Sequence, residues 1–473
     1  AGRLAATDRA CDLSLGLGQV WRLTGEDDPE HHLVTALDGA VATGDRDTGW
    51  RARYELGCWL GFAWDRRGEA LAHFETAARD AGLLGDVPGQ VESLCRWALL
   101  LANELDLTAA IRQADRAVRL VGELGDEVAM GGALDVRKLC ALFLGELDLF
   151  EDLLPGLTDV LHRHDQLWTV QFVLAEAALV ASATGRGDDA AARQAQAFEV
   201  NRRCGDRISA PYLVSTAGRI ERGHGACGTA LDLGREAVAS AAAHRGWWEP
   251  WARTELGITL LEVGQRGAAI EQLERGAAAG LTSQVVRARA HLAMARWRAG
   301  DRDCAVTDLR DAERLLGRAA LPAGRAYLFG ADATLACAAV RLARGETAAA
   351  ERLVAPVLAA AESSGWAEPW ARALLLLARV RALSGGPPQA VEMARRALDV
   401  GVRTGLPVVA LAARAVLAGL GEPDGPGLLA RARADVVELS GSLNGAQDRR
   451  CFVESALAGI DELAGIIPPT AGR

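Results

Sequence analysis

The sequence contains few cysteines, few aromatic residues and almost no lysine. Only 9 of the 473 residues are Cys, and none of them form a C-x-x-C pair. This excludes a disulfide-stapled miniature domain and the usual zinc and thiol-redox motifs. We therefore expect small buried thiols in a reducing cytoplasm. Aromatic residues make up 5% of the chain, and most of the apolar half is Ala and Leu, which favours helices.

Positive charge is also scarce. The chain has 52 Lys and Arg against 62 Asp and Glu, a formal net charge of -10, and Lys138 is its one lysine. Because nucleic-acid binding needs a basic stripe, we expect no direct nucleic-acid binding. No run of 18 apolar residues is present, so we expect no membrane span. The chain opens without a signal peptide and with Ala instead of Met, which predicts a cytoplasmic piece of a longer protein.

Catalytic and metal-binding motifs are missing as well. Lys138 stands without the glycines of a phosphate-binding loop, and no G-x-S-x-G elbow occurs. His162 and His164 would lie on different sides of a helix, and His31-His32 belongs to an acidic segment that reads as a solvated loop. We expect no enzymatic activity, no cofactor and no metal site.

The dominant feature of the sequence is an internal repeat of about forty residues. In residues 250–280, Leu256 and Leu260 indicate a first helix and Gly264 a break. Ala269 begins a second helical pattern. No strand-like alternation occurs, so no strands are expected. Equivalent alanines, with one diverged unit around Phe150, are Ala70, Ala110, Ala190, Ala230, Ala269, Ala305, Ala350 and Ala390.

This unit resembles the tetratricopeptide repeat (TPR). The residues that carry the resemblance are Leu256-Gly257, Leu260, Gly264, Ala269, Leu273 and Gly276, and again Leu56-Gly57, Leu60, Gly68, Ala70, Phe74 and Ala77. The resemblance implies an all-α, right-handed α-α superhelix, a TPR-like solenoid of about ten to eleven helical hairpins with first helices on the concave side. We expect one continuous array over residues 1–440 and a C-terminal capping helix and tail over 441–473.

The long repeat resembles arrays in the C-terminal region of MalT-like and other large ATP-binding LuxR-type, AfsR-type or cyclase-linked bacterial regulators. This implies a non-catalytic sensory or scaffolding segment of a signalling or transcription regulator. It would bind a protein, a peptide or a small-molecule effector in its concave groove, with a nucleotide-binding or cyclase domain N-terminal to it. The alternatives are a stand-alone helical (α/α toroid-like) enzyme and a self-assembling structural repeat protein. The steady repeat register gives no sign of toroid closure.

Two Trp-rich segments match almost residue for residue: residues 246–253 and 365–372, which are 119 residues apart. On one interpretation their tryptophans pack successive repeats together. On the other they line part of the groove with their arginines, because Trp and Arg are enriched at binding hot spots. The binding residues would then be Trp248, Trp251, Arg253, Trp366, Trp370 and Arg372.

Overall fold

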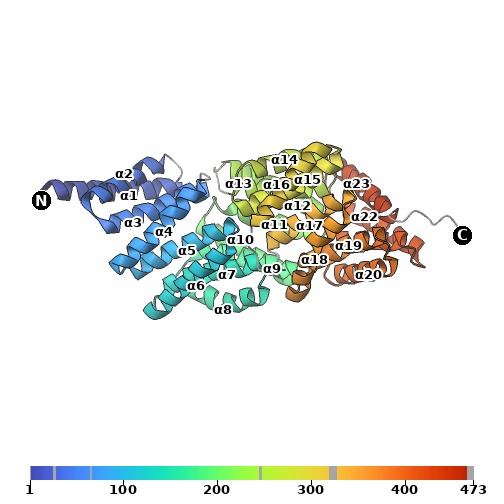
Figure 1. Cartoon of the computed structure of the whole chain (residues 1–473), viewed down its shortest axis with the longest axis horizontal. Coiled ribbons are helices and arrows are strands. Elements are labelled where there is room, and N and C mark those ends of the chain that lie inside the picture. The colour runs from blue at the N-terminus through green and yellow to red at the C-terminus, as the bar shows by residue number, and fades with distance from the viewer. Residues whose placement is uncertain (1, 25–27, 64–65, 244–247, 319–327, 466–473) are drawn as a thin grey trace. The chain divides into compact units, whose positions relative to one another are not determined.

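The computed structural model of the chain describes residues 2–24, 28–63, 66–243, 248–318 and 328–465. Within these ranges the chain forms 23 α-helices, one short π-helical segment and no strand (Figure 1). The all-α fold class of stacked helical hairpins is therefore confirmed. No helix in these ranges is both long and apolar enough to cross a lipid bilayer.

The chain divides into two compact units, residues 1–143 with 149–166 and residues 144–148 with 167–473. In the first unit, α1 packs on α2, α3 on α4, and α5 on α6. The elements up to residue 163 are α1 (Gly2–Thr24), α2 (Pro29–Thr43), α3 (Arg46–Cys58), the π-helical η1 (Trp59–Ala63), α4 (Arg67–Leu84), α5 (Val87–Asn103), α6 (Leu107–Leu124), α7 (Glu127–Leu144) and α8 (Leu147–Arg163).

In the second unit each odd-numbered helix from α9 to α21 packs on the even-numbered helix that follows it, and α23 packs on α21 and α22. The first helices of these hairpins are α9 (Leu167–Ala183), α11 (Ala210–Gly223), α13 (Glu249–Glu262), α15 (Thr282–Ala299), α17 (Leu328–Ala343), α19 (Ala367–Leu383) and α21 (Pro407–Gly419). The second helices and the closing helix are α10 (Gly187–Cys204), α12 (Cys227–Ala243), α14 (Arg266–Ala278), α16 (Arg302–Arg318), α18 (Thr347–Ser364), α20 (Pro387–Arg403), α22 (Gly425–Ser440) and α23 (Ala446–Ala464).

The alanines that define the repeat share one structural position. Each is the fourth residue of the second helix of its hairpin, and each is at most 1% exposed. In the diverged unit the fourth residue of α8 is the buried Phe150. The period in the sequence is therefore the period of the hairpins.

Glycines on the first helices allow close packing of the hairpins. A Cβ atom at Gly257 would lie 2.7 Å from Cγ of Leu273 on the second helix. In the first unit a Cβ at Gly57 would lie 2.7 Å from the Phe74 ring. A larger residue at either position would push the two helices apart. This contact between a small and a large residue, found in both units, makes the hairpins TPR-like.

All nine cysteines are free thiols, and six of them are buried, in keeping with their interpretation as small apolar residues. Cys204 and Cys451 are half-buried and Cys304 is exposed.

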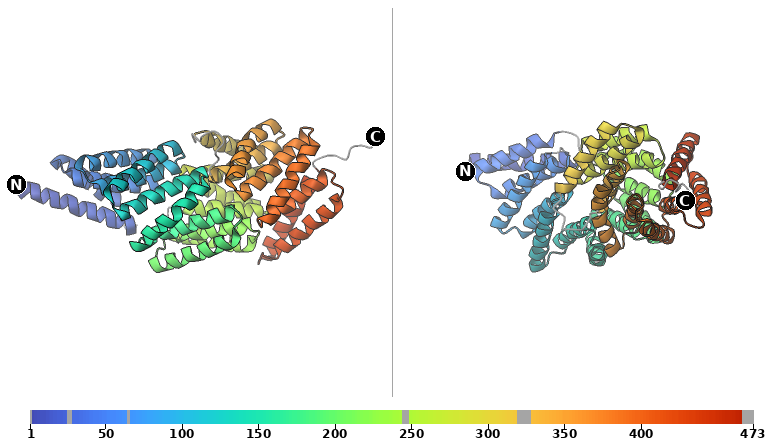
Figure 2. Two further views of the ribbon diagram at one scale, coloured as in Figure 1. Left: turned by 90° about the horizontal axis from the view of Figure 1, so that it is seen from below. Right: turned by 45° about the vertical axis from the view of Figure 1, so that its right-hand side comes forward.

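The C-terminal helices of the second unit pack against helices about 200 residues earlier in the chain. One apolar cluster joins Leu256 and Leu260 of α13 to Val436 of α22 and Phe452 of α23. Figure 2 shows the C-terminal helices in red next to the green helices of the same unit. The second unit thus closes on itself, which the repeat register did not predict.

Polar contacts reinforce this closure. Gln265 Nε2 donates to Asp448 Oδ1 at 2.5 Å, and the Gly228 amide donates to Ser442 Oγ at 3.4 Å. Asn444 and Gly445 lie in the connection between α22 and α23, and α23 falls in the segment for which a capping helix was predicted. The division of the chain at residue 440 stays a prediction, and residues 466–473 lie outside the described ranges.

Two glycines with the same backbone conformation allow the closure to be tested. Gly264 has φ 86° and Gly300 has φ 89°, so alanine at either position would cost about 1–2 kcal/mol. Only at Gly264 would the new Cβ also meet Cys451 O, at 2.6 Å, whereas at Gly300 nothing lies within 4 Å. We expect Gly264→Ala to lower the melting temperature clearly more than Gly300→Ala, as measured by circular dichroism. Equal decreases in the melting temperature of the two variants would show that α23 does not pack against this turn.

Candidate ligand-binding pocket

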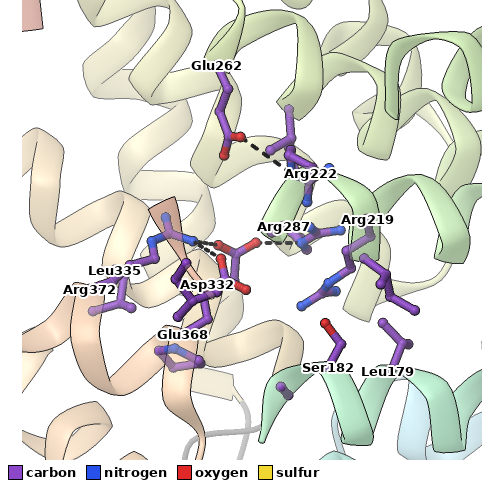
Figure 3. A pocket seen from close by; sticks show the side chains of 16 residues that line it. Leu179, Ser182, Arg219, Arg222, Glu262, Arg287, Asp332, Leu335, Glu368 and Arg372 are labelled. Atoms are coloured by element: carbon purple, nitrogen blue, oxygen red, sulfur yellow. Dashed lines mark hydrogen bonds and ion pairs between the residues drawn. The ribbon is translucent and has the colours of Figure 1, made fainter. Parts of the chain in front are cut away.

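A pocket opens between the first helices of the second unit (Figure 3). Its lining comes from α9, α11, α13, α15, α17 and α19, and from Leu406 at the N-cap of α21. None of the lining residues belongs to a second helix. The cavity between these side chains is small, with a volume of about 30 Å³.

Charged side chains dominate the pocket. The four arginines are Arg219, Arg222, Arg287 and Arg372, and the three carboxylates are Glu262, Asp332 and Glu368. They come from five successive first helices, which places charges that are up to 153 residues apart in the sequence (Arg219 to Arg372) around one space. Figure 3 shows Arg287 and Arg372 approaching Asp332 from opposite sides.

Glu255 of α13 forms ion pairs with the arginines on one side of the pocket. Its side chain is 2% exposed. Arg222 Nη1 donates to Oε2 at 3.0 Å, and Arg287 Nη1 donates to Oε1. Burial opposes ionisation of this carboxyl group, but Arg287, Arg222 and Arg219 outweigh it and lower the pKa of Glu255 to about 2. Glu255 is therefore a fixed negative charge.

Asp332 of α17 forms ion pairs with the arginines on the other side of the pocket. Arg287 Nε donates to Oδ2 at 2.7 Å, and Arg372 Nη1 donates to Oδ1 at 2.8 Å. His291 Nε2 lies 3.0 Å from the same Oδ2. Burial raises the pKa of Asp332, but His291, Arg287 and Arg372 outweigh it and hold the pKa well below its usual range. Burial lowers the pKa of His291, so its neutral ring donates the Nε2 hydrogen.

Arg219 of α11 lies beside the same Glu255 carboxylate. Its Nη1 lies 3.9 Å from Glu255 Oε1, which is beyond hydrogen-bonding distance. Burial and the neighbouring charge of Arg287 lower the pKa of the Arg219 guanidinium. Burial among other arginines therefore disfavours the charged form of Arg219.

Glu262 lies near the mouth of the pocket. It is 3.7 Å from Arg222 Nε, and its side chain keeps 35% of its surface exposed. Burial raises the pKa of Glu262, and Arg222 opposes this effect without cancelling it. The deep part of the pocket is thus cationic and its edge is acidic.

The first Trp-rich segment lies beside the pocket. Trp248, at the N-cap of α13, stacks on Tyr212 with ring centroids 4.5 Å apart. Trp251 is buried, and the Arg287 guanidinium lies 5.6 Å from its ring centroid. Arg253 faces α14, because its Nε donates to Glu249 Oε1 at 2.7 Å and its Nη1 to Gln272 Oε1 at 2.9 Å. Residues 246 and 247 lie outside the described ranges.

The second segment is divided between core and pocket. Trp366 is fully buried, and Trp370 packs in apolar clusters with Ala371 and Leu374. Arg372 lines the pocket. Of the six residues predicted from the sequence, the structure thus brings Arg372 into the pocket and Trp251 against one of its arginines. The other four lie elsewhere.

Sequence reasoning missed most of the charged groups. Arg219, Arg287 and Asp332 each stand in a helix that is otherwise rich in apolar and small residues. The sequence did contain a signal for these residues, namely a charged residue on the apolar face of a helix. A buried charge needs an opposite charge or a hydrogen-bond partner, so such a residue indicates an ion pair or a site. Within the described part of the chain, no group of three His, Cys, Asp or Glu side chains is placed to hold a metal ion.

No family profile matches the sequence, and no curated protein is significantly similar to it.

Several solved structures are similar in helical arrangement. A Rap protein in complex with Competence and Sporulation Factor is 13% identical, with a TM-score of 0.46 over 71% of this chain and 99% of that chain. A STAND protein with a tetratricopeptide repeat sensor, from Pyrococcus horikoshii, is 14% identical, with a TM-score of 0.41 over 82% of this chain and 52% of its own length. A human IFIT1 dimer with PPP-AAAA is 14% identical, with a TM-score of 0.40 over 83% of this chain and 95% of that chain. Likenesses at this level say nothing about function.

Replacing Glu255 tests the charge network. Glu255→Gln takes the carboxylate from Arg219, Arg222 and Arg287, and breaking a buried ion pair costs about 3–5 kcal/mol. Because the folded pKa of about 2 lies below the ordinary 4.5, the stabilisation is complete above about pH 4.5 and is lost as the pH falls toward 2. We expect the variant to melt at a lower temperature at neutral pH and to depend less on pH between 4.5 and 2.

Glu271→Gln, which removes an exposed ion pair with Arg275, is the matched control and should melt like the wild type. An unchanged acid dependence in Glu255→Gln would contradict the role of Glu255.

Proposed function

We propose that this chain is a non-catalytic helical-repeat binding module that takes an acidic group of a protein segment or small ligand into its concave pocket. The observation that supports it most directly is the convergence of Arg219, Arg222, Arg287 and Arg372 around one solvent-connected space. Planar guanidinium groups bind carboxylates and phosphates through paired hydrogen bonds. A pocket that removes them from bulk water strengthens such contacts.

The two buried carboxylates favour binding over catalysis. General acid–base catalysis works best with a pKa near the working pH. Arginines hold the pKa of Glu255 at about 2 and that of Asp332 well below its usual range, so neither can donate a proton at neutral pH. Their role in this proposal is to position the arginines. Burial raises the pKa of Glu262, which is the direction that a general acid would need.

The biological setting that we propose follows from the resemblance of the repeat. The chain would be the sensory or scaffolding segment of a cytoplasmic bacterial signalling or transcription regulator, with a nucleotide-binding or cyclase domain N-terminal to it. Ligand binding between α11 and α19 would stabilise one arrangement of the closed second unit and thereby report to that domain.

Titration with inorganic phosphate tests the pocket. At constant ionic strength, phosphate should raise the melting temperature of the wild type, because a ligand that binds the folded state stabilises it. Arg219→Gln should lose this rise.

The matched control is Arg275→Gln on the exposed surface of α14, which should respond to phosphate like the wild type. This comparison also subtracts the general salting-in or salting-out effect of phosphate. An equal response of Arg219→Gln and Arg275→Gln would overturn the proposal.

A further inference from the structure

Ser182, in the last turn of α9, directs its hydroxyl group differently from its neighbour Thr184. The Thr184 hydroxyl donates to Val180 O at 2.8 Å. Such a bond to the carbonyl four residues earlier is usual for hydroxyl side chains in helices. The Ser182 hydroxyl is directed instead to the imidazole of His224, with Oγ 3.4 Å from Nε2. Ser182 therefore pairs a potential nucleophile with a potential base.

His224, the C-cap residue of α11, is oriented from its other side by a backbone carbonyl. Its Nδ1 lies 3.3 Å from Gly405 O, in the connection between α20 and α21. A carbonyl oxygen only accepts hydrogen bonds, so Nδ1 carries the ring hydrogen and donates it. In the neutral ring Nε2 is then the acceptor, and it faces Ser182 Oγ. The contact with Gly405 thus fixes the tautomer in which His224 can take a proton from Ser182.

The closure of the second unit brings these three groups together. Ser182 and His224 come from neighbouring hairpins, whereas Gly405 follows His224 by 181 residues. Backbone also packs against the ring: a Cβ at Gly187 would lie 3.6 Å from His224 Cε1, and one at Gly405 would lie 3.7 Å from Nδ1. Both values are ordinary contact distances, so the imidazole is held in place on two sides.

Ser182 also lines the pocket. Its side chain is half-buried, and Figure 3 shows the hydroxyl oxygen pointing toward the side chain of Arg219 on the adjacent helix. When a nucleophile attacks a carbonyl group, negative charge develops on the carbonyl oxygen. Guanidinium groups that already line the pocket are suited to stabilise such a charge.

A hydroxyl group, a base within hydrogen-bonding reach and a third group that orients the base together activate a serine as a nucleophile. Without substrate, the distance between hydroxyl and base is often long, as the 3.4 Å between Ser182 and His224 is. We propose that Ser182 is a nucleophile that a short activated ester acylates, with His224 as general base and Gly405 O as the group that orients it. This inference goes beyond the proposed function, because it adds a covalent step to a binding module.

The step is a single acyl transfer. Ser182 Oγ forms a bond to the carbonyl carbon of the ester while its proton passes to His224 Nε2. The bond between that carbon and the leaving oxygen then breaks, and His224 returns the proton to the leaving oxygen. The products are the acyl ester of Ser182 and an alcohol. Because the cavity is small, we expect a short acyl group to enter it and the leaving group to stay outside.

Acetylation by 4-nitrophenyl acetate, located by mass spectrometry of proteolytic peptides, tests the inference. We expect the acetyl group on Ser182 and not on Ser363, an exposed serine of α18 whose hydroxyl donates to Ala360 O. The exposed thiol of Cys304 also reacts with such esters and serves as an internal reference for the reagent. Acetylation of Cys304 without acetylation of Ser182 would overturn the inference.

Replacing the base separates an activated serine from a merely packed one. His224→Gln keeps a donor for Gly405 O but removes the proton acceptor. Acetylation of Ser182 should then slow by about 100-fold or more, because a positioned general base contributes about 10²–10⁴-fold. His162→Gln, which changes an exposed histidine in the last turn of α8, is the matched control and should leave the rate unchanged. Equal rates in the wild type and His224→Gln would show that His224 is not the base.

A thiol at the same position gives a second measurement that leaves His224 intact. A thiol beside an imidazole is ionised more readily, and the thiolate is the reactive form. Ser182→Cys should therefore react with iodoacetamide at this site about tenfold faster than Ser363→Cys does at its own, although Ser363 is the more exposed position. A slower reaction at Ser182→Cys than at Ser363→Cys would contradict an activated position and overturn the inference.

Discussion

The close approach of the two helices in each hairpin is the constraint on which the rest of the structure depends. A buried alanine at the fourth position of eight second helices, from α4 to α20, with Phe150 in its place in α8, sets this approach. Because the same contact recurs, successive hairpins in each unit stack in register, as repeat proteins do. In the second unit this stacking directs the side chains of six first helices into one pocket.

The charge network fixes what that pocket can accept. Burying arginines in a helical stack is costly unless carboxylates accompany them. Glu255 and Asp332 meet this need, and Arg287 bridges the two. Arg219 lies beside the same Glu255 carboxylate, at 3.9 Å, so one buried acid pairs with three arginines from two first helices at once.

Much of the fold could be predicted from the sequence, because it depends on local repetition. The alanine period located the second helices, and Gly264 marked the turn between α13 and α14. The pocket could not be predicted in the same way. Arg219 and Arg372 are 153 residues apart, and their proximity depends on how every intervening hairpin packs. The Trp-rich segments drew attention through their similarity, but that similarity reflects packing at Trp366 and Trp370 as much as any surface.

The closure of the second unit has a consequence for the order in which the protein forms during synthesis. Every residue that lines the pocket precedes residue 407, whereas the contacts of α23 with the turn at Gly264 involve Cys451 and Ser455. Contacts so far apart in the sequence form late, because a long stretch of chain must first be ordered. All the walls of the pocket are therefore synthesised before α23, the helix that packs against α13 and the turn at Gly264.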